Sequence, residues 1–177
     1  VGLLGEYQRQ NISIACTVAD YLHENTPLSI SRRALVEGLR DVAEITAFRG
    51  RWQVLDTAPL TVCDTGHNAH GLALVGEQLR HRNGGRLCCV MGFCADKNVD
   101  EILHLMPADA HYIFTRADVA RAAMPDAIAA TARGLGLDCE TADTVAEAVA
   151  RARAMLSSED MLFIGGSTFV VAEAIGQ

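Results

Sequence analysis

The 177 residues, half of them hydrophobic and 21% charged, describe a globular chain that can bury one good core and is neither disordered nor fibrous. A formal net charge of −7 argues against nucleic acid as a partner, since nucleic acid needs a basic face that displaces its counterions. No apolar run approaches the roughly 18 residues of a membrane helix and no signal peptide is recognised, so we expect a cytoplasmic protein that acts on small molecules.

The N-terminal part of the chain predicts helices. Apolar residues recur three or four apart across residues 7–22, and Ser31 is expected to cap a second helix that continues to about residue 42. The pattern breaks at residues 48–51, which we interpret as an interdomain linker. We therefore expect residues 1–47 to be the helical tail of a preceding domain, and the chain to be a fragment of a longer protein.

From residue 52 onward, short apolar runs alternate with helices of ten or so residues, a pattern typical of parallel crossovers. The turn after the first run predicts one antiparallel pair. Residues 52–177 thus predict an α/β, Rossmann-like domain whose doubly wound sheet is mostly parallel with one antiparallel edge strand. The strands are expected at 52–55, 60–63, 87–91, 111–114 and 161–165, and the helices at 69–81, after Asn98, at 125–133, after Thr144 and at 166–175.

Three loops of this domain follow predicted strands. Their sequences are DTGHN at residues 64–68, GFCADKN at 92–98 and GGST at 165–168. Ligands of doubly wound sheets bind beyond the carboxyl ends of the strands, so the three loops are expected to open on the same edge. Their convergence indicates a binding site more strongly than any one of them.

Each loop carries polar side chains that allow a functional and an ordinary interpretation. Asp64 could accept hydrogen bonds from a ribose and His67 could donate to a phosphate, or Asp64 and Asn68 could simply bond the turn backbone. Lys97, the only lysine, precedes a helix start where a phosphate could bind, or it is a solvated surface residue. Ser167 could bind a carboxylate, cap a helix, or do both.

A metal site is the next possibility that the residue pattern raises. Cys63, His67 and His70 could be ligands with Cys94 as the fourth, but the spacing matches no usual zinc pattern and Cys63 lies on the buried side of a strand. We therefore expect no metal ligands in this chain.

Arg51 could reach a nucleotide phosphate or be a surface arginine. Neither a phosphate loop nor a G-x-G-x-x-G after a strand is present.

Taken together, the segments GEYQRQN, GRWQV, CDTGHNAHG, GFCADKNV and GGSTFVVAEAI resemble, in this order, segments of folylpolyglutamate synthase and dihydrofolate synthase of the Mur ligase superfamily. The resemblance covers nearly the whole chain but only the C-terminal part of a family member. It implies an ATP-dependent ligase that adds L-glutamate to a folate γ-carboxylate through an acyl phosphate. The phosphate loop and the Mg²⁺ ligands would lie in the missing N-terminal domain, so the chain alone is expected to be inactive.

The resemblance also implies roles for particular residues around ATP and glutamate. Those expected to contact the nucleotide are Asn11, Arg51 at a phosphate and Asp64 at the ribose. Those expected near the reacting groups are His67 beside the phosphates, Lys97 facing the transferring phosphate and Ser167 facing the incoming glutamate.

Two alternatives to this function remain open. One is a peptidoglycan-precursor ligase of the same superfamily, which differs in substrate rather than in chemistry. The other is a non-catalytic, doubly wound ligand-binding module that is complete in itself. The sequence predicts no macromolecular partner beyond the chain's own N-terminal domain, and it makes no prediction about oligomeric state.

Overall fold

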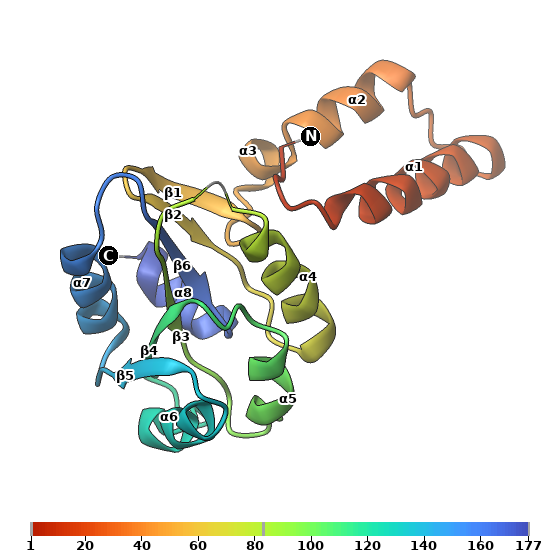
Figure 1. Cartoon of the computed structure of the whole chain (residues 1–177). Coiled ribbons are helices and arrows are strands. Elements are labelled where there is room, and N and C mark those ends of the chain that lie inside the picture. The colour runs from red at the N-terminus through yellow and green to blue at the C-terminus, as the bar shows by residue number, and fades with distance from the viewer. Residues whose placement is uncertain (1, 83, 177) are drawn as a thin grey trace. The chain divides into compact units, whose positions relative to one another are not determined.

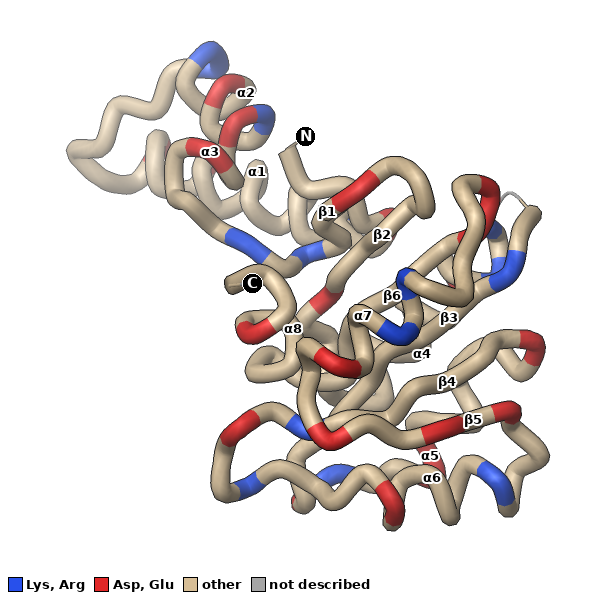
Figure 2. The backbone as a smooth tube through the Cα atoms, turned by 90° about the vertical axis from the view of Figure 1, so that its left-hand side faces the viewer, with Lys and Arg blue, Asp and Glu red and all other residues tan. Residues whose placement is uncertain are grey.

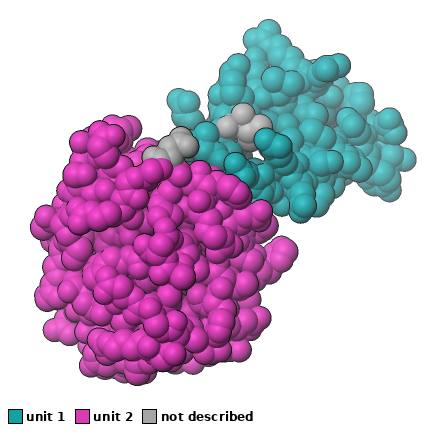
Figure 3. All heavy atoms as spheres, in the orientation of Figure 1, with its two compact units in different colours: residues 1–52 teal, residues 53–177 magenta. Residues whose placement is uncertain are grey.

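The computed structural model describes residues 2–82 and 84–176 and divides the chain into two compact units, Val1–Trp52 and Gln53–Gln177 (Figure 3). The division falls one residue beyond the start expected for the second domain. Residues 48–51, which we interpreted as a linker, are grouped with the first unit.

Within the described residues, the first unit consists of helices α1 (Gln8–Asn25), α2 (Arg32–Arg40) and α3 (Val42–Thr46) (Figure 1). Ser31 caps α2 as expected, because its hydroxyl accepts a hydrogen bond from the backbone N–H of Ala34 at 3.1 Å. The unit leaves much of its apolar surface uncovered. Its exposed large apolar side chains are those of Leu4, Ile14, Val18, Tyr21, Leu28, Val36, Ile45 and Phe48.

The second unit contains one sheet with the strand order β1-β2-β6-β3-β4-β5 among the described residues (Figure 1). All neighbouring pairs are parallel except β1 with β2, which are antiparallel at one edge. This topology confirms the doubly wound, mostly parallel α/β sheet that was predicted. The strands span Gln53–Thr57, Leu60–Cys63, Leu87–Met91, His111–Phe114, Asp138–Thr141 and Met161–Gly165 for β1 to β6.

The edge strand β5 was missed by the sequence prediction. It pairs in parallel with β4, from His111 opposite Asp138 to Phe114 opposite Thr141. Its side chains are exposed or only half-buried. A short strand of this kind shows no continuous apolar run, which was the signal that identified the central strands.

Helices cover both faces of the sheet, which explains why β3 and β6 are buried along their whole length. On one face α7 packs against α8 and against β3 and β4, while α5 contacts α4 and α6 in the other layer (Figure 1). The helices of this unit are α4 (Ala69–Arg80), α5 (Val99–His104), α6 (Pro125–Gly134), α7 (Val145–Met155) and α8 (Thr168–Ile175).

The starts of these helices follow the predicted capping residues. Asn98 accepts a hydrogen bond from the Glu101 backbone N–H at 3.4 Å, and Thr144 accepts one from that of Glu147 at 3.2 Å. Pro125 occupies the first position of α6. None of the helices in the described part of the chain is long and apolar enough to cross a membrane.

Acidic side chains on the strands are confined to the two edges of the sheet. Asp56 lies on β1, and Asp138 and Glu140 lie on β5, whereas the four central strands carry no acidic side chain and no lysine or arginine (Figure 2). The buried acidic side chains Asp64 and Asp160 lie just outside these strands, directly after β2 and directly before β6. Polar loops at the carboxyl ends of the central strands form the candidate site.

Candidate functional site

The loops that follow β2, β6 and β3 begin at the same rim of the sheet. These strands are adjacent and parallel, and their last residues are in register, with Cys63 opposite Ile164 and Met91 opposite Gly165. The pairing extends past the strand ends, since the Asp64 N–H donates to the Ile164 carbonyl at 3.1 Å. The loops at residues 64–68, 92–98 and 165–167 consequently leave the sheet side by side, as the sequence predicted.

A close approach of two glycines holds two of these loops together. Gly166 has a φ of +84°, and a Cβ added there would lie 2.8 Å from the carbonyl oxygen of Gly92. A residue with a side chain could not adopt this backbone without strain and could not fit against the neighbouring loop. Glycine is therefore required at this position by both conformation and space.

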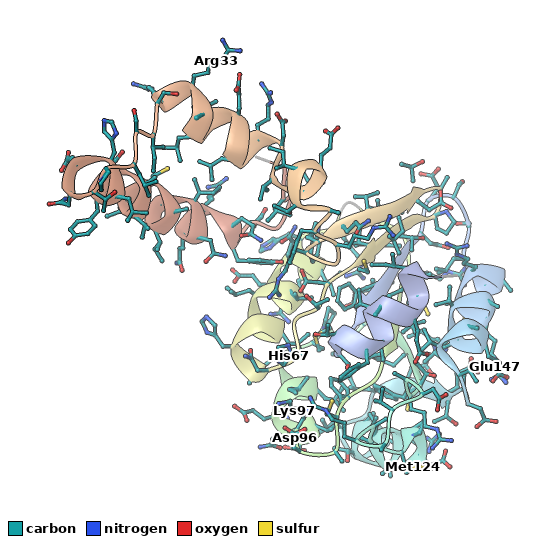
Figure 4. All side chains as sticks on the ribbon, turned by 180° about the vertical axis from the view of Figure 1, so that it is seen from behind. Arg33, His67, Asp96, Lys97, Met124 and Glu147 are labelled. Atoms are coloured by element: carbon teal, nitrogen blue, oxygen red, sulfur yellow. The ribbon has the colours of Figure 1, made fainter. Side chains whose placement is uncertain are left out.

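A pocket of about 260 Å³ opens between these loops in the second unit. It brings together His67, Lys97 and Ser167, three residues for which the family resemblance implied positions near the reacting groups. Figure 4 shows His67 and Lys97 on neighbouring loops along the same edge of the unit. The residues that line the pocket are His67, Cys94, Lys97, Arg121, Gly166, Ser167, Thr168 and Phe169.

Asp64 and Asn68 form the backbone hydrogen bonds expected of ordinary turn chemistry. Asp64 is 1% exposed, and its Oδ1 accepts from the Gly66 N–H at 2.7 Å. Asn68 caps α4, since its Oδ1 accepts from the Gly71 N–H at 2.8 Å. Both side chains thus shape the turn, and any contact of Asp64 with a nucleotide would come in addition to this role.

Lys97 is half-buried at the pocket rather than fully exposed to solvent. Its side chain is 25% exposed, and its Nζ lies 3.0 Å from Oδ2 of the preceding residue, Asp96. The hydrogen bond from Lys97 lowers the pKa of Asp96 below its usual range, so this carboxylate stays ionised beside the ammonium group. The pair lies just before α5, where the cation is held at the rim of the pocket (Figure 4).

His67 and Ser167 face the same pocket from two different loops. The Nδ1 of His67 lies 3.0 Å from the Thr65 carbonyl oxygen, which can only accept, so Nδ1 carries a proton. Ser167 is 4% exposed and caps α8, because its hydroxyl accepts from the Phe169 N–H at 3.2 Å. The predicted N-cap is confirmed, and a contact of Ser167 with glutamate stays a prediction.

Arg121 is a pocket residue that the sequence analysis missed. It lies in the loop that follows β4, and β4 is the next strand of the sheet after β3. That loop has no glycine, whereas each of the other three loops contains at least one. The signal that could have identified it is positional, because every parallel strand of this sheet ends at the same edge.

Asn11 and Arg51 belong to the first unit. Asn11 is exposed on α1, where its Nδ2 donates to Oε1 of Gln8 at 2.8 Å. Arg51 is half-buried at the end of this unit. Their expected contacts with the nucleotide stay predictions.

The thiol considered as a metal ligand lies in an unfavourable environment for metal binding. Cys63 is fully buried, and burial, assisted by the nearby Asp64, raises the pKa of its thiol to about 12. A thiolate is the form that binds a metal, so this environment works against coordination. Across residues 2–82 and 84–176, no three His, Cys, Asp or Glu side chains form a group that could hold a metal ion.

Comparisons with known proteins identify relatives of this chain. Residues 50–168 match the family described as Mur ligase, glutamate ligase domain. A probable bifunctional folylpolyglutamate synthase/dihydropteroate synthase of Haloferax volcanii is 33% identical over 98% of this chain. The match covers 20% of that protein, so the chain spans about a fifth of its length.

Solved structures share the fold. The Mycobacterium tuberculosis folylpolyglutamate synthase complexed with ADP has a TM-score of 0.81 and 24% identity, over 98% of this chain and 40% of that one. A bifunctional folylpolyglutamate synthase/dihydrofolate synthase with Mn, AMPPNP and L-glutamate bound has a TM-score of 0.74 and 22% identity, over 85% of this chain and 35% of that one. The family match covers more than half of the chain and includes all three loops of the rim. The chain therefore belongs to the Mur ligase family, with its glutamate ligase domain at residues 50–168.

Proposed function

We propose that this chain is the C-terminal part of an ATP-dependent ligase that joins L-glutamate to the γ-carboxylate of a folate. The observation that carries the proposal is the pocket at the carboxyl ends of β2, β6 and β3, where Lys97, His67 and Ser167 meet. The similarity to the Haloferax protein supports folate as the acceptor. The bifunctional synthase that is named with a nucleotide analogue and L-glutamate bound supports ATP and glutamate as co-substrates.

The proposed reaction proceeds in two balanced steps. The γ-phosphoryl group of ATP passes to a folate carboxylate oxygen, which gives an acyl phosphate and ADP. The uncharged amine of glutamate then attacks the acyl carbon, phosphate leaves with the bonding electrons, and the proton that the amine loses passes to solvent. Lys97 offsets the negative charge of the transferring phosphate, and the N-terminus of α8 at Ser167 receives a glutamate carboxylate.

The pocket itself does not suit the Mg²⁺ that such a ligase would use. Mg²⁺ prefers carboxylate oxygens and water, whereas the pocket presents Lys97, Arg121, a histidine and a serine. We therefore place the metal ligands in the part of the longer protein outside this chain. The six cysteines, all free, fit the reducing cytoplasm that we propose as its compartment.

A turnover assay of the longer protein tests the function. We expect release of ADP that requires tetrahydrofolate, L-glutamate and Mg²⁺ together, with a product that is one glutamate heavier by mass spectrometry. Dihydropteroate tests for the second activity, and a uridine-diphosphate muramoyl peptide tests for the peptidoglycan alternative. Turnover with the muramoyl substrate alone would overturn the proposal. The 177-residue chain by itself should turn over none of these substrates.

A matched pair of variants tests the ribose contact proposed for Asp64. Asp64→Ala and Asn68→Ala both remove a short hydrogen bond to the turn backbone, but only Asp64→Ala removes a carboxylate. We expect Asp64→Ala to weaken ATP binding about 10- to 100-fold with little effect on folate, since a hydrogen bond to a charged group contributes about 1.5–3 kcal/mol. Equal losses of ATP affinity in both variants would assign the effect to the turn rather than to the ribose.

A further inference from the structure

We infer that Arg121 binds the side-chain carboxylate of the incoming amino acid and thereby sets the ligase's preference for an acidic one. The inference rests on the function proposed above. Arg121 lines the same pocket as Lys97 and Ser167 but comes from a separate loop, the one that follows β4. It adds a second cation to a pocket whose other positive side chain is Lys97.

The guanidinium of Arg121 is held in place by two contacts on the pocket wall. Its Nε donates to the Sγ of Cys94 at 3.3 Å, and Cys94 is 5% exposed. Its carbon Cζ lies 5.3 Å from the centre of the Phe169 ring, a cation–π distance. Phe169 belongs to the first turn of α8, so the arginine is positioned by the same helix start that Ser167 caps.

The backbone around Arg121 is also fixed. The Arg121 carbonyl accepts from the Ala95 N–H at 2.9 Å, within a short antiparallel bridge between residues 94 and 122. On the other side of the loop, Oε1 of Glu173 on α8 accepts from the Asp118 N–H at 2.7 Å. Arg121 is itself exposed, and these contacts reduce the conformational entropy that its side chain loses when it binds a ligand.

The two terminal nitrogens of Arg121 are available to a ligand. Within the described residues, the guanidinium donates a hydrogen bond to Cys94 only and forms no ion pair. Paired N–H groups of an arginine match the two oxygens of a carboxylate in a bidentate arrangement. Lys97 forms an ion pair with Asp96, whereas Arg121 feels the charge of that carboxylate without forming an ion pair with it.

The charges of the substrate match two cations in one pocket. The amine of the amino acid must be uncharged to attack, and an acidic amino acid then carries two carboxylates and no positive charge. Its α-carboxylate is one carbon from the amine and stays close to the reacting centre, where we place Lys97 and Ser167. The side-chain carboxylate lies farther out, and Arg121 is the cation that remains for it.

Steady-state kinetics of the longer protein with two amino-acid acceptors test the inference. L-glutamine keeps the amine and α-carboxylate of glutamate and replaces only the side-chain carboxylate with a neutral amide. We expect Arg121→Gln to lower kcat/KM for glutamate about 10- to 100-fold, as for the loss of a charged hydrogen-bonded pair, while kcat/KM for glutamine changes little. Arg121→Lys should recover part of the loss, since it restores charge without the fork.

Arg116→Gln provides the matched control, because Arg116 is an exposed arginine of the same loop outside the pocket lining. It should keep the wild-type preference for glutamate. An equal loss for glutamate and glutamine in Arg121→Gln would overturn the inference. So would a rise in KM for ATP with none for glutamate, because that result would assign Arg121 to the phosphate. If the wild-type protein showed no glutamate-dependent turnover, the proposed function itself would fail.

Discussion

Replacing Gly166 with alanine should destabilise the second unit by about 2–6 kcal/mol. Holding the left-handed backbone that Gly166 adopts at a φ of +84° costs a residue with a Cβ about 1–3 kcal/mol. The new Cβ would also lie 2.8 Å from the Gly92 carbonyl oxygen and 2.9 Å from Cε1 of Phe93. Overpacking against a backbone that cannot move freely costs about 1–3 kcal/mol more. The total is a large share of the roughly 5–15 kcal/mol that stabilises a domain.

Two other glycines separate conformational strain from the close contact. Gly136 has a φ of +75° with open space around its Cβ position, so Gly136→Ala should cost only the strain, about 1–3 kcal/mol. Gly134, the last residue of α6, has open space and no positive φ, so Gly134→Ala should be neutral or stabilising by up to about 1 kcal/mol.

The assay is urea unfolding followed by circular dichroism, with the slope of the transition checked for each variant. The expected order of stability is Gly134→Ala above Gly136→Ala above Gly166→Ala. If Gly166→Ala costs no more than Gly136→Ala, the contact with Gly92 does not hold the two loops together. Steric contact would then not require a glycine at position 166, and only the positive φ would favour one.

Two further predictions concern groups with displaced pKa values. Burial raises the pKa of Cys63 and Cys88 to about 12. At pH 8 a thiol reagent should therefore modify the half-buried Cys16 in the native chain, and Cys63 and Cys88 only on unfolding. Rapid modification of Cys63 or Cys88 in the native chain, mapped by mass spectrometry, would contradict their burial. Hydrogen bonds from Ser157 and Arg86 lower the pKa of Asp160, so its stabilising effect should be complete above pH of about 4 and be lost as the pH falls through the lowered pKa. Asp160→Asn should flatten this acid limb of the stability curve, and an unchanged slope would refute the assignment.

The sequence predicted the central part of the sheet because burial on both faces leaves a plain signal. A strand such as LCCVM at residues 87–91 is apolar at every position, and all five side chains are buried. The edge strand at Asp138–Thr141 has no such signal, since it forms only by pairing with β4. Its existence depends on tertiary contacts that periodicity does not reveal.

The candidate site was predictable in the same partial way. Lys97 and Ser167 were identified because they precede helix starts after apolar strands, and this local arrangement is encoded in neighbouring residues. Arg121 was missed because its position in the pocket depends on contacts with Cys94 and Phe169, which lie far from it in the sequence. A loop arginine without those contacts would be an ordinary surface residue.

The net charge of the chain is negative, whereas the charged side chains of its pocket are positive. Both charges bear on function. A chain with a formal charge of −7 has no general attraction for anions, which is why the sequence argues against nucleic acid as a partner. Yet both ligands proposed for this pocket, a nucleotide phosphate and an acidic amino acid, are anionic. The attraction must therefore be local, and it comes from Lys97, Arg121 and the N-terminus of α8. Because screening confines such attraction to about 10 Å, it favours small anions that enter the pocket over extended polyanions that must contact the acidic surface around it.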